Sequence, residues 1–170
     1  MNIHFKITFQ HMDQIRKDLQ RPHPFADERV GFLYVGRGDD GQGGIVLMGC
    51  EYFPVRDDHY VPDCTVGAKI GQEAIREAMQ KTLDIRKGAF HVHMHGLKGS
   101  PGVSKTDRQS LFKLMPSFHN VAPGFPHGLI ILSIDSLLGR VWLNKEDMFS
   151  ISKVTVVGFP MDIRQGGIYA

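Results

Sequence analysis

The sequence contains few cysteines, no long hydrophobic run and almost no net charge. Two cysteines, Cys50 and Cys64, are too few for a disulfide framework and favour a reducing compartment. No apolar run approaches the ~18 residues of a membrane-spanning helix, and the first ten residues do not resemble a secretory signal. The 20 basic side chains nearly cancel the 18 acidic ones, which argues against a nucleic-acid-binding surface. We therefore expect a cytoplasmic protein that binds neither nucleic acid nor membrane.

Length and composition indicate one globular domain. A chain of 170 residues can bury a core without disulfides, and 42% hydrophobic with 22% charged residues is typical of a folded protein. We expect a single domain over residues 1–160 and a C-terminal tail over 161–170, in which Gly166 and Gly167 belong to a flexible end.

Strand patterns dominate the chain. Apolar residues that alternate or cluster between turn residues predict strands at 3–9, 28–36, 45–55, 88–94, 128–135, 139–144 and 152–159. The second and third of these strands should form one hairpin, and the fifth and sixth another.

Helical spacing marks three further segments. Met12, Ile15 and Leu19 predict a first helix, and a second is expected over 69–84 with Ile70, Ala74, Ala78, Met79 and Leu83 on its buried face. A third should begin at Ser104, run to about Met115 and stop at Pro116. The order of elements predicts a mixed α/β (α+β) domain, with a central β-sheet flanked by helices.

Three histidines alternate along one predicted strand, in the segment "HVHMH" at 91–95. Residues two apart point to the same face of a strand, so their imidazoles can converge on a single metal ion. Zinc binds histidine nitrogen and carboxylate oxygen, and a catalytic zinc has three protein ligands. A third ligand should therefore come from another part of the chain.

Asp107 is the nearest candidate for that ligand, although it also fits a purely structural role. Ser104 is a good N-cap, and an acid three residues later resembles a capping box.

The spacing between the histidines and Asp107 favours the role of metal ligand over a purely structural one. Starting from His93 and His95, the chain has the form H-x-H-G-x7-S-x2-D, which ends at Ser104 and Asp107. It resembles the JAMM motif, H-x-H-P-x7-S-x2-D, of the JAB/MPN metalloprotease family, whose domain is cytidine-deaminase-like. Starting from His91 places Lys105 at the aspartate position, and lysine is a poor zinc ligand. His91 is therefore expected to be a neighbour of the site.

An upstream glutamate completes the resemblance. Glu28 precedes the glycine-containing strand "VGFLYVG" as the family's glutamate does, whereas without the motif it would be an exposed acid at a strand start. Asp27 is adjacent but one position out of register. Gly96 replaces the family's proline and changes the expected turn, not the ligands.

The resemblance implies a zinc-dependent isopeptidase. One Zn²⁺ per chain would be held by His93, His95 and Asp107, with Glu28 as general base and then acid and Ser104 as an oxyanion donor. The expected partner is a ubiquitin-like protein, matured or removed from target lysines, together with E1-like and E2-like proteins of a bacterial anti-phage conjugation system. A peptidase that trims a sulfur-carrier protein and a non-catalytic MPN scaffold remain alternatives.

The substrate tail is expected to bind by strand addition along residues 52–67. Tyr60 and Val61 are the predicted contacts, although this segment is also consistent with an ordinary surface connection. His119 and His127 are expected in surface loops.

Overall fold

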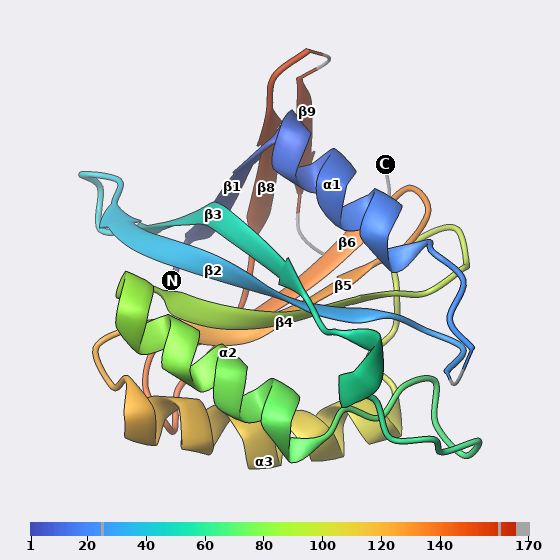
Figure 1. Cartoon of the computed structure of the whole chain (residues 1–170). Helices are drawn as coiled ribbons and strands as arrows, with labels where there is room; N and C mark the ends of the chain where they lie inside the picture. Colours follow the sequence, from blue (N-terminus) through green and yellow to red (C-terminus); the bar gives the residue numbers. More distant parts are fainter. Residues whose placement is uncertain (25, 160, 166–170) are drawn as a thin grey trace.

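The computed structural model describes residues 1–24, 26–159 and 161–165 (Figure 1). This described part contains nine strands, three α-helices and one short 3-10 helix. In chain order they are β1 (Ile3–Thr8), α1 (Phe9–Leu19), β2 (Val30–Asp39), β3 (Ile45–Pro54), η1 (Asp57–His59), α2 (Gln72–Ile85), β4 (Gly88–Met94), α3 (Lys105–Val121), β5 (His127–Leu132), β6 (Leu137–Trp142), β7 (Met148–Ser150), β8 (Lys153–Val157) and β9 (Asp162–Gln165).

The nine described strands form one curled, mixed sheet in the order β7-β6-β5-β4-β2-β3-β1-β8-β9. Strand β1 is parallel to β3 and β8, strand β4 is parallel to β5, and the other neighbours are antiparallel. Both predicted hairpins, β2–β3 and β5–β6, are confirmed. The mixed α/β class, with a central sheet and helices against it, is confirmed as well.

Helices cover both faces of the sheet (Figure 1). Helix α1 packs on one face, where Ile15 belongs to the same core cluster as Phe90 and Val92 of β4. Helices α2 and α3 lie on the other face, where Ala89 of β4 shares a cluster with Ala74 and Phe118. Because side chains alternate along a strand, His91 and His93 point toward the face of Ala89, where α2 and α3 pack.

Two details of the helix predictions were wrong. Helix α3 does not stop at Pro116 but continues to Val121. Proline removes one backbone donor, yet Met115 and Phe118 are almost fully buried on either side of it, and this packing stabilises the extra turn. In α2 the buried positions are Ala74, Ala78 and Thr82, whereas Leu83 is 46% exposed.

The C-terminal segment adds an edge strand to the sheet. Residues 161–170 were expected to form a tail, and within them Asp162–Gln165 pair with β8 as strand β9. The expected flexible end at Gly166 and Gly167 lies outside the described residues. None of the helices in the described ranges combines the length and apolarity that crossing a membrane requires.

Candidate metal centre

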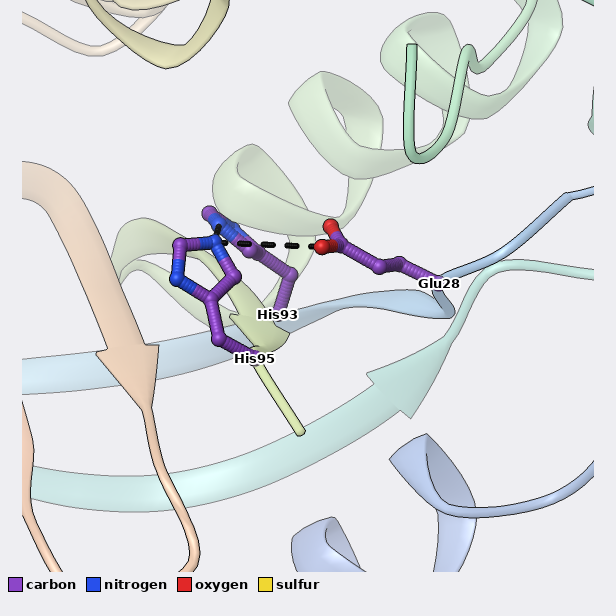
Figure 2. A group of neighbouring side chains, drawn as sticks. All are labelled: Glu28, His93 and His95. Carbon is purple, nitrogen blue, oxygen red and sulfur yellow. Dashed lines mark hydrogen bonds and ion pairs between the residues drawn. The ribbon is translucent and has the colours of Figure 1, made fainter. Parts of the chain in front are cut away.

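His93 and His95 form a close pair at the end of β4 (Figure 2). His93 is only 2% exposed, and its Nε2 lies 3.2 Å from Nε2 of His95. His95 follows the strand, and its backbone N–H donates to the Leu132 carbonyl at the end of β5. The strand geometry and this hydrogen bond hold two imidazoles toward one point.

Glu28 approaches the pair from the neighbouring strand. Strand β2 runs antiparallel to β4 with Val30 opposite His93, so the residues just before β2 pass beside His95. The Glu28 Oε1 atom lies 3.8 Å from Nε2 of His95. Glu28, His93 and His95 each offer a ligand atom within 4.8 Å of the others, and this group can hold a metal ion.

Asp107 approaches from the first turn of α3. Its Oδ2 accepts a hydrogen bond from the Ser104 N–H at 2.9 Å, and Ser104 Oγ accepts one from the Asp107 N–H at 3.0 Å. This is the capping box expected from the sequence. The other oxygen, Oδ1, lies 3.5 Å from Nε2 of His93. A carboxylate therefore flanks the histidine pair on each side.

The pKa values of the two carboxylates are shifted in opposite directions. Burial raises the pKa of Glu28, outweighing the opposite effect of His95. Burial also acts to raise the pKa of Asp107, but the hydrogen bonds from Ser104 and the proximity of His93 outweigh it, so the net pKa is lowered. Glu28 is thus the carboxyl group more easily protonated, and Asp107 the one that stays ionised.

The histidines of β4 are held neutral. Burial lowers the pKa of His93 to about 4 and that of His91 to about 3. Neutral imidazole is the form that binds metals. His91 stacks edge-on against His93, with ring centroids 5.4 Å apart, but it is not part of the group of three. Its buried Nδ1 has no hydrogen-bond partner among the described residues.

A cleft of about 720 Å³ adjoins these side chains. Residues on one face of α3 line it, namely Asp107, Ser110, Leu114 and Ser117, and so do Asp63 and residues 65–70. These α3 residues follow helical spacing from Asp107, so the sequence contains a signal for this side of the cleft.

The two predicted tail contacts lie outside this lining. Tyr60 is 7% exposed, and its hydroxyl bonds the backbone N–H of Val30 at 2.8 Å, so its side chain belongs to the core. Val61 is 40% exposed but does not line the cleft. The neighbouring residues Val66, Ala68 and Ile70 line it instead.

His119 and His127 are buried, so their prediction as surface-loop residues was wrong. The continued helix α3 places His119 beside Phe118, and His127 begins β5. Nδ1 of His127 accepts from the Ala89 N–H, and its Nε2 donates to the Ala122 carbonyl. Both ring nitrogens of His127 are thus hydrogen-bonded to backbone groups inside the core.

No protein-family model matches the chain, and no curated protein matches it. The assignment of the site therefore depends on its own residues and their geometry.

Proposed function

We propose that this chain is a zinc-dependent peptidase of the JAB/MPN type, with a cytidine-deaminase-like domain, that cleaves after the C-terminus of a ubiquitin-like protein. The supporting observation is the convergence of three motif residues, His93, His95 and Asp107, with the upstream Glu28 beside one cleft. Maturation of a precursor and removal from target lysines use the same amide chemistry. E1-like and E2-like proteins of a cytoplasmic anti-phage conjugation system are the proposed partners.

The donor set suits zinc. Two nitrogens bound to one tetrahedral zinc at about 2.0–2.1 Å would lie about 3.3 Å apart, and the two Nε2 atoms are 3.2 Å apart. The group of three that can hold a metal contains Glu28, but we assign Asp107 as the third ligand beside His93 and His95. Its Oδ1 lies 3.5 Å from His93 Nε2, closer than the 3.8 Å between Glu28 and His95, and its lowered pKa favours the ionised form. When bound, zinc supplies Lewis-acid polarisation of the scissile carbonyl and lowers the pKa of coordinated water from 15.7 to about 7.

Glu28 is the proposed proton carrier. Its raised pKa suits a group that accepts a proton from water and then gives it to the leaving amine. Asp107 has a lowered pKa, which favours the ionised form that a metal ligand needs and leaves both proton transfers to Glu28.

Ser104 is the proposed donor to the oxyanion. Its oxygen accepts a hydrogen bond from the Asp107 N–H, and a hydroxyl keeps one proton of its own to donate. Fixing the oxygen in this way orients the hydroxyl before the substrate arrives, which is the condition for electrostatic stabilisation of the transition state.

The test is mass spectrometry of products formed from three substrates. These are a ubiquitin-like protein fused to a short C-terminal peptide, the same protein linked to a lysine side chain, and a sulfur-carrier precursor. The zinc-loaded protein should cleave the first two substrates directly after the C-terminus of the ubiquitin-like protein. Chelation of the zinc should stop the reaction. Cleavage of the sulfur carrier alone would indicate the alternative substrate, and intact substrates throughout would contradict the proposal.

A further inference from the structure

The segment 65–70, which lines the cleft, is hydrogen-bonded to the chain that carries Glu28. The backbone carbonyl of Gly67 accepts hydrogen bonds from the N–H groups of Asp27, at 2.9 Å, and of Glu28, at 3.0 Å. Two further contacts join the chain around Glu28 to residues 57–60, just before this segment. The Tyr60 hydroxyl bonds the backbone of Val30, and the buried Arg29 pairs with Asp57.

Gly67 also leaves the space that the Glu28 carboxylate occupies. A Cβ atom added at Gly67 would lie 2.7 Å from Glu28 Cδ and 2.8 Å from Oε2. These distances are shorter than carbon atoms tolerate, so a side chain at position 67 and the present position of the carboxylate exclude each other. Gly67 has no positive φ, so the backbone conformation does not itself demand glycine.

We propose that Gly67 is a positioning residue for Glu28. Its carbonyl fixes the backbone of Glu28, and its missing side chain lets the carboxylate lie beside His95, at 3.8 Å from Nε2. The catalytic consequence rests on the proposed function, since it treats Glu28 as the proton carrier. The structural consequence, displacement of the carboxylate, does not.

The first experiment is the crystal structure of the metal-free Gly67→Ala variant. The Glu28 carboxylate should move away from the added methyl group, and its distance from His95 Nε2 should change from the present value. A carboxylate that stays in place, with the methyl group accommodated by a shift of the 63–69 segment, would overturn the proposal. This outcome is independent of whether the protein cleaves anything.

The second experiment measures kcat, KM and zinc content. Gly67→Ala should lower kcat by about 10- to 100-fold, because small misplacements of a catalytic group have effects of this size, with KM and zinc little changed. Gly102→Ala is the matched control, since a Cβ there meets no atom within 4 Å. An equal loss in both variants, or none in Gly67→Ala, would contradict the assignment.

A double-mutant cycle with Glu28→Asp separates positioning from a general loss of stability. Aspartate lacks the Cδ atom that would lie 2.7 Å from the added Cβ, so Gly67→Ala should reduce kcat less in the Glu28→Asp background than in the Glu28 protein. The double variant also relieves the overlap if Gly67→Ala alone fails to fold. The same factor in both backgrounds would show that Gly67 acts independently of Glu28. An inactive wild-type protein would count against the proposed function, while leaving the structural test of Gly67 intact.

Discussion

Ser104 and Asp107 hold each other at the first turn of α3, each accepting a hydrogen bond from the backbone N–H of the other. Only one oxygen of Asp107 takes part, and the second faces His93 at 3.5 Å. The pair therefore joins the start of a helix to the candidate metal site. It also means that helix capping and metal binding can be separated by substitution.

Asp107→Asn should lose zinc while keeping the helix. The amide oxygen can still accept from the Ser104 N–H, but the negative charge that favours the cation is gone. Ser104→Ala should do the reverse, retaining zinc and losing about 1 kcal/mol of stability with the cap. Elemental analysis and urea unfolding of both variants measure the two effects. Unchanged zinc in Asp107→Asn would exclude Asp107 as a ligand.

Glu28→Gln should keep zinc and fold but lose most activity. The amide has nearly the same shape and cannot accept the proton, and general acid–base catalysis is typically worth about 10²- to 10⁴-fold in rate. Steady-state cleavage of the fused ubiquitin-like substrate gives the measurement, with Asp27→Asn as the control for the adjacent acid. If Glu28→Gln turns over like the wild type and Asp27→Asn does not, the proton carrier is Asp27.

His91→Ala should retain zinc, whereas His93→Ala should lose it. Both histidines point from β4 toward the same face, but only His93 brings its Nε2 close to His95 and Asp107. Circular dichroism checks that both variants are folded. Their zinc content, from elemental analysis, then decides the register of the motif. Loss of zinc from folded His91→Ala would show that the motif begins two residues earlier.

Acid should destabilise the metal-free protein between pH 6.5 and pH 4, partly through His127. Burial lowers the pKa of His127 to about 4 in the folded state, whereas the unfolded value is about 6.5. In this window the unfolded chain binds a proton that the folded chain does not. The free energy of unfolding therefore falls as pH falls, by up to about 1.4 kcal/mol per pH unit for this group.

Urea unfolding at several pH values measures that slope, and His127→Gln should make it shallower. His91 and His93 have lowered pKa values too, so part of the slope should remain in the variant. An identical slope in wild type and His127→Gln would contradict the role of His127.

The sequence predicted the proximity of His93, His95 and Asp107 better than the lining of the cleft beside them. Alternation along β4 and the fixed spacing to Ser104 and Asp107 are local patterns, and local geometry translates them directly into neighbouring side chains. Tyr60 shows the opposite case. Its position in an irregular segment suggested a surface contact, but its ring fills the core and its hydroxyl bonds Val30, a contact thirty residues away that no local pattern encodes.

Tertiary packing also overrode local preference in α3. Pro116 predicts a helix end, yet burial of Phe118 and His119 extends the helix past it. The short edge strands β7 and β9 were not predicted, because their few residues gain their structure from pairing with β6 and β8.

Anomalous diffraction at the zinc edge, from crystals of the zinc-loaded protein, would locate the metal and identify its ligands. We expect one peak per chain, about 2.0–2.2 Å from Nε2 of His93, Nε2 of His95 and Oδ1 of Asp107, with Glu28 nearby but not bonded. The absence of a peak between the two histidines, or a zinc ion that is bound by Glu28 in place of Asp107, would contradict this expectation.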